Sequence, residues 1–452
     1  MRRARGLGNV GARPGSPRSQ GEITSLSLLD DLLFNLGYAI PMALQGTFTR
    51  NPRRVAFFTR VHPDPAAVRF VGRLRERYGG GVLGLHLGLT KSVLVLDPDA
   101  VQRVLDRSPT VYADPPPKRN GMSVFQPNAV TISRGEAWRD RRRFNEAVLE
   151  SERPAHPYAE SILEIVRAEV VLAPRLERWD DFDGLFARIM RQVIFGRSAR
   201  DDAELTDLLR RLLQEANRQV RRGTPKEFAP FYARIRHYLN DPEPGSLVAR
   251  CRQVPATERT KVENQIPHWM FAMWETLGAN TVRALAAILA HPRAEARVHE
   301  ELAGADPATP DGIVRLRYLD GCLQEAMRLW PTTPMLVREA LAADALGGIT
   351  VPAGRQVVIW NSFNHRDRAA YPQADTFAPE AWAAGRPSPL FNHLSSGPQV
   401  CAGVNLLLFI GKAVLATMLT HGRYVLLEPP LDPTRPLPYA YNVFEVRVRR
   451  RA

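Results

Sequence analysis

The chain has 452 residues, of which 44% are hydrophobic and 8% aromatic, and this composition excludes a protein that is disordered throughout. Its 61 basic and 47 acidic residues give a net charge of +14, and the sequence pI is near 10.2. Only five of the basic residues are lysines, so we interpret the charge as an arginine-rich composition and expect no nucleic-acid partner.

Membrane spans and secretion signals are not indicated. The apolar segment 26–48 is interrupted by Asp30, Asp31 and further polar residues, so it lacks the about 20 continuous apolar residues of a transmembrane helix. The first residues also lack the apolar core of a secretory signal peptide. No CxxC pair is formed by the three cysteines, Cys251, Cys322 and Cys401. We therefore expect a cytoplasmic protein without a transmembrane anchor.

The first part of the chain mixes helix and strand patterns. Residues 1–22, rich in Arg, Gly, Pro and Ser, predict a flexible basic tail. A helical apolar pattern runs over 64–78, and two alternating runs, 82–87 and 92–96, predict a hairpin. A helix should begin at Asp97 or Asp99. The stretch 108–132, rich in Pro and Gly, predicts a long loop.

Helical periodicity dominates 135–330, where no strand pattern is evident. Its longest helix, predicted over 257–290, would span about 50 Å, with Pro267 as a kink or restart. Short extended runs and turns fill 331–398, and 399–452 predicts one helix followed by terminal strands. We expect a single domain over 23–452, mainly α with a smaller β region, in which 64–134 and 331–398 are the mixed sheet and loop parts.

A lone cysteine follows a turn-forming stretch and precedes an apolar helix in 394–403, LSSGPQVCAG. The N-terminus of that helix would stabilise a thiolate at Cys401, as a permanent metal ligand requires. Gly397 allows a close turn, and Gly403 removes bulk where a flat cofactor could pack. Taken alone, the pattern favours an inert buried cysteine, which is the commonest fate of a free cysteine.

An acid and an arginine, Glu325 and Arg328, are spaced i, i+3 on a predicted helix, so they face each other across one turn. Pairs of this kind are common and by themselves say little.

Together, these segments resemble the cytochrome P450 superfamily of soluble bacterial type, over most of the chain from residue 64 onward. The resemblance implies that Cys401 is the axial ligand of haem b, that Trp138, Arg142 and Arg338 reach its propionates, and that Glu325 and Arg328 are structural. Further landmarks of the family are matched by His365, Arg366, Asp367, Phe377, Pro379 and Glu380.

Three residues depart from the family pattern. Leu394 stands where an aromatic residue is usual, and Gln399 replaces a basic residue, so one propionate contact loses its charge. Ala381 replaces the arginine that usually completes a triad with Glu325 and Arg328. These departures bear on the haem salt bridges and not on the thiolate.

The long helix carries the acid and alcohol that the family uses to relay protons during oxygen activation. Two registers compete, Glu275-Thr276 and Asn280-Thr281, and we prefer the first because it keeps a true acid. Met273 is bulkier than the residue usual at its place, which predicts a narrowed pocket above the haem.

The resemblance implies a haem-thiolate monooxygenase that uses dioxygen to oxidise a small organic substrate, in bacterial specialised metabolism. Its electrons would come from a ferredoxin- or flavodoxin-type donor, with Arg139, Arg141 and Lys412 as contacts. One alternative is a haem enzyme of non-standard reaction, such as isomerisation, dehydration, coupling or peroxide-driven oxidation. A second is a non-catalytic binding module, against which Cys401 argues. The candidate pocket residues are Met122, Val124, Met273, Pro334 and Met335.

Overall fold

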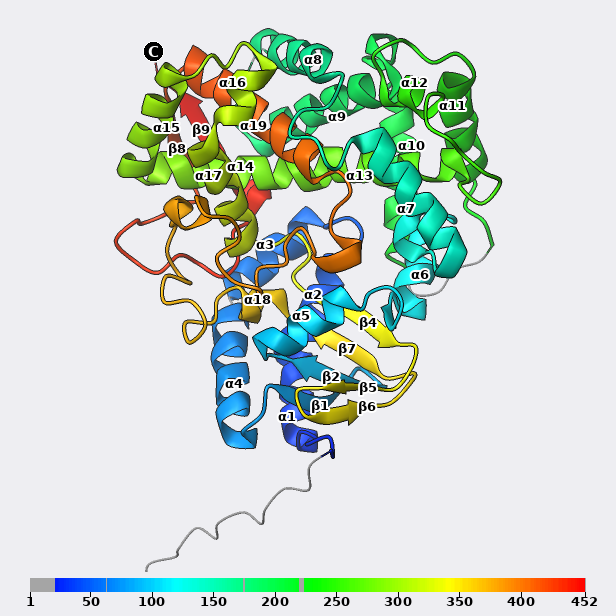
Figure 1. Ribbon diagram of the computed structural model, residues 1–452. Coiled ribbons are helices and arrows are strands. Elements are labelled where there is room, and N and C mark those ends of the chain that lie inside the picture. The colour runs from blue at the N-terminus through cyan, green and yellow to red at the C-terminus, as the bar shows by residue number, and fades with distance from the viewer. Residues whose placement is uncertain (1–20, 62, 174, 219–222, 452) are drawn as a thin grey trace, which may run out of the picture.

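The computed structural model describes all residues except 1–20, 62, 174, 219–222 and 452, so most of the predicted basic tail lies outside the described residues. Helices occupy the upper part of the molecule and the main sheet its lower part (Figure 1). The chain begins with the elements α1 (Leu28–Phe34), η1 (Asn35–Ala39), α2 (Ile40–Gln45), α3 (Pro52–Val61) and α4 (Pro63–Tyr78).

The main sheet has five strands in the order β1-β2-β7-β4-β3. Its strands are β1 (Val82–Leu87), β2 (Thr90–Val95), β3 (Tyr112–Ala113), β4 (Leu336–Ala340) and β7 (Gln356–Ile359). The predicted hairpin is confirmed as β1 and β2. The pair β2-β7 is parallel, and the pairs β1-β2, β7-β4 and β4-β3 are antiparallel. Asp97 caps α5 (Pro98–Asp106) by accepting a hydrogen bond of 2.8 Å from the Ala100 N–H.

The stretch 108–132 contains more regular structure than predicted, because β3, α6 (Pro116–Met122) and the 3₁₀ turn η2 (Val130–Ile132) lie within it. In a sequence, consecutive prolines indicate a loop. A proline is nevertheless well suited to the first turn of a helix, where its missing N–H is not needed.

The middle of the chain is helical, and no strand lies in its described part between 135 and 330. Its helices are α7 (Gly135–Leu149), α8 (Ala159–Leu172), α9 (Trp179–Phe195), η3 (Arg197–Ala199), α10 (Ala203–Ala216), α11 (Phe228–Asn240), α12 (Leu247–Cys251), η4 (Val262–Asn264), α13 (Ile266–Phe271), η5 (Ala272–Thr276), α14 (Leu277–Ala290), α15 (Pro292–Gly304), α16 (Pro310–Arg315) and α17 (Arg317–Leu329).

The long helix is shorter than predicted. It runs through α13, η5 and α14, from residue 266 to 290, while residues 257–265 form turns and η4. Pro267 lies in the first turn, where it starts the helix and does not kink it. The interruption comes instead at η5, a π-helical stretch, a feature often found at functional sites.

The last part returns to sheet, loops and one long helix. Its remaining elements are β5 (Asp344–Leu346), β6 (Ile349–Val351), α18 (Asn361–Asn364), η6 (Pro379–Trp382), η7 (Gly397–Gln399), α19 (Val404–His421), β8 (Tyr424–Glu428), η8 (Val443–Glu445) and β9 (Arg447–Arg450). The fold is therefore mainly α with a smaller β region, as the sequence predicted.

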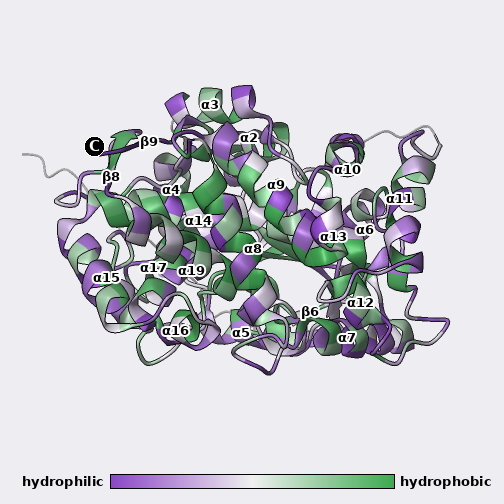
Figure 2. Cartoon of the chain, turned by 90° about the horizontal axis from the view of Figure 1, so that it is seen from above, coloured by the Kyte–Doolittle hydropathy of each residue, from purple (hydrophilic) through white to green (hydrophobic). Residues whose placement is uncertain are grey.

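The largest apolar cluster contains the buried faces of α9, α14, α17 and α19. Seen from above, hydrophobic residues gather on the central helices α8, α14 and α19 (Figure 2). Among the described residues, α19 alone is long and apolar enough to cross a membrane, and 72% of it is buried inside the protein, as in a core helix.

Candidate functional site

Cys401 lies at the end of a tight loop just before α19. Its N–H donates to the Leu394 carbonyl at 2.9 Å, and the Val400 N–H donates to the Gly397 carbonyl at 3.0 Å, so the loop closes on itself. Gly397 has φ +62°, and a Cβ there would lie 2.6 Å from the Leu105 carbonyl oxygen. Glycine is therefore required for this loop to pack against α5.

The loop is fastened to the end of α7 from its other side. The Arg142 guanidinium donates to the Val400 carbonyl at 2.5 Å and to Glu146 at 2.6 Å. Ser151, which follows α7, donates to the Ala402 carbonyl, and Asn405 donates to the Ser151 carbonyl at 2.8 Å. The position of Cys401 is thus set by a helix far away in the sequence.

Cys401 lines a small cavity of about 110 Å³ between its loop, α7 and the long helix. The predicted residues Trp138, Arg142, Gln399 and Gly403 line the same cavity, and Met273 forms part of the wall from the long helix. Burial raises the pKa of the Cys401 thiol, while the Gly403 N–H and the Arg142 charge oppose that rise. A Cβ at Gly403 would meet Leu149 at 3.5 Å, an ordinary contact, so close packing against a flat cofactor stays a prediction.

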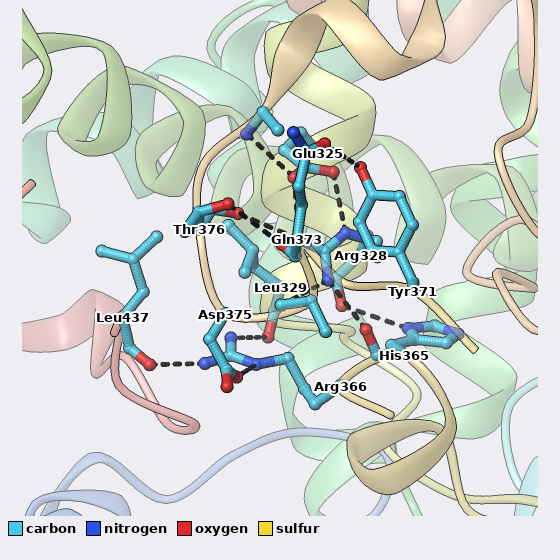
Figure 3. A network of polar contacts seen from close by, with 12 residues as sticks. Glu325, Arg328, Leu329, His365, Arg366, Tyr371, Gln373, Asp375, Thr376 and Leu437 are labelled. Atoms are coloured by element: carbon cyan, nitrogen blue, oxygen red, sulfur yellow. Dashed lines mark hydrogen bonds and ion pairs between the residues drawn. The ribbon is translucent and has the colours of Figure 1, made fainter. Parts of the chain in front are cut away.

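Glu325 and Arg328 on α17 form a fully buried ion pair (Figure 3). Arg328 donates to both carboxylate oxygens, at 2.8 and 2.7 Å. Its other hydrogens go to the carbonyls of His365, Ala374 and Thr376, at 2.7, 2.8 and 3.1 Å. All five guanidinium donors are therefore used. This is a structural network, far from the weak surface pair that the spacing alone suggested.

Trp382 completes this network, and the sequence reasoning missed it. Its indole N–H donates to Glu325 at 2.8 Å, and the Ala378 N–H donates to the same carboxylate at 3.0 Å. The absent arginine at Ala381 is thus replaced by a neutral donor one residue later. The signal available in the sequence was a tryptophan next to Ala381, the position that departs from the family pattern.

His365 connects this network to the cysteine loop. One ring nitrogen donates to the Arg328 carbonyl at 3.1 Å, and the other accepts from the Asn392 N–H at 3.2 Å. Burial holds the pKa of His365 well below its usual value, so the ring is neutral and can do both. Asn392 accepts from the Ser395 N–H at 2.8 Å, inside the loop that leads to Cys401.

The π-helical stretch η5 contains residues of two rows on the long helix, each of which lines a different cavity. His268, Trp269, Ala272 and Met273 line the cavity of Cys401. Phe271, Glu275, Thr276 and Ala279 line a second, larger cavity of about 440 Å³. The two cavities share no lining residue. The helix therefore presents one row to the thiol and another to the larger space.

The preferred acid, Glu275, accepts a hydrogen bond of 3.2 Å from Thr49, in the segment between α2 and α3. Burial raises its pKa to about 7, although the Thr49 hydroxyl opposes the rise, so the carboxyl can both hold and release a proton near neutral pH. Asn280 and Thr281, the other register, line neither of the two cavities described. The Thr281 hydroxyl instead bonds the Leu277 carbonyl at 2.8 Å.

Other predicted site residues do not line the cavity of Cys401. Arg338, predicted to reach a propionate, donates to Asp114 at 2.8 Å, an acid that also pairs with Lys118. Pro334 lines the larger cavity. Neither of the two described cavities is lined by Met122, Val124 or Met335, which are packed in the apolar clusters.

Two of the three residues predicted to contact the electron-donor protein are wrong. Arg141 is buried and bonds the Arg259 carbonyl, Ser133 and Asn128. Lys412 is also buried, and its ammonium pairs with Asp320 at 3.5 Å. Both residues lie on the buried side of their helices, α7 and α19. A charged residue in a sequence does not show which side of a helix faces the interior. Arg139 is exposed and pairs with Glu136.

The residues around Cys401 fit a haem by the chemistry of their donors. A thiol, the indole of Trp138 and the guanidinium of Arg142 border one cavity. Gln399 borders the same cavity, and its amide N–H would be a neutral donor toward a propionate. The cavity is smaller than a porphyrin, so a bound haem would also take space that side chains such as Met273 occupy.

The chain matches a known protein family over most of its length. The family described as Cytochrome P450 matches residues 57–171 and 169–435. The chain belongs to the cytochrome P450 family. It is similar to cyclooctat-9-en-7-ol 5-monooxygenase of Streptomyces melanosporofaciens, with 24% identity over 383 residues, 76% of this chain and 82% of that protein.

Two further relatives match shorter parts. Pentalenene oxygenase of Streptomyces avermitilis is 27% identical over 293 residues, 62% of each chain. Cytochrome P450 4c3 of Drosophila melanogaster is 30% identical over 183 residues, 38% of this chain and 34% of that protein. The chain thus spans about a third of the length of such insect relatives.

Proposed function

We propose that this protein is a haem-thiolate monooxygenase that oxidises a small organic substrate with dioxygen. The observation that carries the proposal is the thiol of Cys401 in one cavity with Trp138 and Arg142, facing the long helix. When bound, haem b would supply the redox-active iron with which the family carries out oxidation. Cys401 would ligate that iron, and Arg142 and Trp138 would hold a propionate.

Proton delivery is the second part of the proposal. Glu275 has a pKa near 7 and lies beside Thr276 on the wall of the larger cavity. An acid with such a pKa can pass protons inward at neutral pH, and the adjacent hydroxyl can position water. We propose that this pair takes up protons on the side of the larger cavity and passes them around the long helix toward the cavity of Cys401, where haem would bind.

The larger cavity is the proposed substrate site. Its volume of about 440 Å³ suits a molecule of moderate size. Pro334 and Phe271 supply apolar walls, and Arg210 and Asp183 form an ion pair of 3.0 Å among its lining residues. The names of the two Streptomyces relatives describe oxidation of small organic molecules, which supports bacterial specialised metabolism as the setting.

Electrons would come from a small acidic ferredoxin- or flavodoxin-type protein in the cytoplasm. The face near the cysteine loop carries the exposed arginines Arg139 and Arg143, although each pairs with an acid on α7. We propose docking there, with the attraction weakened by salt.

A non-standard haem reaction is the second candidate, because Met273 fills space on the thiol side and the acid lies on the other cavity. Product formed per reductant consumed separates the two. In a monooxygenase with this relay, Glu275→Gln lowers that ratio severalfold, whereas a reaction without oxygen activation leaves it unchanged.

The haem proposal is tested by the spectrum of the reduced, carbon monoxide-treated protein. Cys401→Ser should abolish the thiolate-type Soret band. Cys251→Ser and Cys322→Ser, at buried cysteines outside both cavities, should keep it. A thiolate-type band that survives in Cys401→Ser contradicts the ligand assignment.

A further inference from the structure

The first helices of the described chain expose an apolar surface. Every exposed residue between 28 and 45 is Leu, Ile or Ala. The large side chains among them are 45 to 85% exposed, and we call them the leucine face. The leucine face comprises Leu28, Leu29, Leu32, Leu33, Leu36, Ile40 and Leu44.

The charged residues of this segment point the other way. Asp30 and Asp31, the only acids in 28–45, are 4 and 7% exposed. Asp30 accepts a 2.6 Å hydrogen bond from the Tyr78 hydroxyl, and Asp31 accepts one of 3.0 Å from the His86 N–H. These bonds fix the rotation of α1, so its leucines face outward. A helix surrounded by water has the opposite arrangement, with charges outside.

The π-helical stretch η1 keeps this face in line. Residues spaced by four drift around an α-helix by about 40° per step, since four residues exceed one turn of 3.6. A π-helical turn contains more residues, so it takes back part of this drift. Leu28, Leu32, Leu36, Ile40 and Leu44 therefore stay on one side over a length of about 24 Å.

The neighbouring helix α3 adds positive charge and further apolar groups. Phe57 and Val61 are 58 and 59% exposed. Arg53, Arg54 and Arg60 are exposed as well, and Arg54 donates to the Leu44 carbonyl at 3.0 Å, at the end of the leucine face. The sequence 46–61 contains no acid, and residues 1–20 contain five arginines and no acid.

We propose that the leucine face and the arginines of α3 dock this protein onto an anionic lipid bilayer, with α1, η1 and α2 lying flat in the interface. Apolar area enters the headgroup region and the arginines meet lipid phosphates. The segment does not span the bilayer, because its inner side is held against the fold by Asp30 and Asp31.

Docking would also bring the larger cavity close to lipid. Met42 of α2 and Val55 of α3 line that cavity, so it lies one helix layer below the docking surface. In Figure 1, α1 lies beside β1 at the lower edge of the molecule, away from the α8 and α19 side. The proposal itself does not depend on haem chemistry.

The test is co-sedimentation with vesicles of phosphatidylcholine alone or mixed with equal parts of phosphatidylglycerol. The wild-type protein should bind the mixed vesicles, and less at high salt. The combined variant Leu29→Gln, Leu32→Gln and Leu36→Gln should reduce the partition coefficient about tenfold or more. The matched control, Val171→Gln, Leu172→Gln and Leu427→Gln, removes exposed apolar side chains of α8 and β8 and should bind as wild type does.

Two further measurements are needed. One separates the apolar contribution to vesicle binding from the charge contribution, and the other separates vesicle binding from self-association. Arg53→Gln with Arg54→Gln should lower the preference for mixed vesicles while leaving weak binding to phosphatidylcholine. Equal binding by the leucine variant and its control, or no binding by wild type, overturns the proposal. So does sedimentation velocity that shows a wild-type dimer which the leucine variant dissociates, since a second copy would then cover the face. Circular dichroism and thermal midpoints verify that each variant is folded.

Discussion

Replacing Trp382 with phenylalanine should expose how much the substitute donor contributes to the Glu325 network. The variant keeps a ring in the same buried place and removes one hydrogen bond of 2.8 Å to a carboxylate that is 0% exposed. A hydrogen bond to a charged group contributes about 1.5 to 3 kcal/mol, and the loss of ring volume adds a smaller destabilisation.

Trp360→Phe provides the matched control. Trp360 is 0% exposed, and in the described chain its indole N–H has no charged acceptor, only a weak contact with the Tyr38 hydroxyl. Both variants lose the same volume, so the difference between their free energies of unfolding isolates the hydrogen bond. We expect Trp382→Phe to be less stable than Trp360→Phe by about 2 kcal/mol.

The assay is urea unfolding of the haem-free chain, followed by two probes to check that the transition is cooperative. Equal losses in the two variants would refute the reasoning, because they would show that Glu325 gains nothing from the indole. A Trp382→Phe variant that also loses haem faster than Trp360→Phe would extend the effect to the cysteine loop.

Three further outcomes are expected. Gly397→Ala should lower the thermal midpoint and haem retention by more than Gly88→Ala, about 2 kcal/mol in stability, since both glycines have φ near +60° but only the first would clash with Leu105. Glu275→Gln should be up to about 3 kcal/mol more stable than wild type at about pH 8 and equal to it below about pH 4.5. The reason is that a carboxyl with a folded pKa near 7 binds a proton that the unfolded chain has lost, so wild-type stability falls as pH rises through this range. A difference in urea midpoints that does not change with pH would contradict this prediction. Thr49→Val removes the hydrogen bond that lowers this pKa, so the end of the transition should move to higher pH; an unchanged profile would show that the 3.2 Å contact is not formed in solution.

The fold could be predicted wherever local chemistry determines it. The hairpin β1-β2 follows from period-two alternation, and α5 from the cap at Asp97. The long helix was overextended because 257–265 shows a helical apolar pattern that turns and η4 override. The π-helical stretch η5 was not predictable, because widening one turn depends on packing and leaves no fixed sequence signal.

The candidate site, too, could be predicted only in part. The positions of Cys401, Trp138 and Arg142 around one cavity follow from motifs whose residue types carry the chemistry. Arg141 and Lys412 were misplaced, because a charge in a sequence does not say which side of a helix faces the interior. Contacts outside the motifs, such as the hydrogen bond from Trp382 to Glu325, could not be predicted, since they depend on how separate segments meet.

The saturation of Arg328 has a consequence for which substitutions this region can tolerate. A lysine carries three donors, so it would leave at least two of the five acceptors around α17 without a hydrogen bond. Glu325, in contrast, accepts equally from a peptide N–H and an indole, and other neutral donors of the right reach could serve it. The hydrogen-bond donors of Glu325 can therefore be replaced by others, whereas the position of Arg328 requires an arginine.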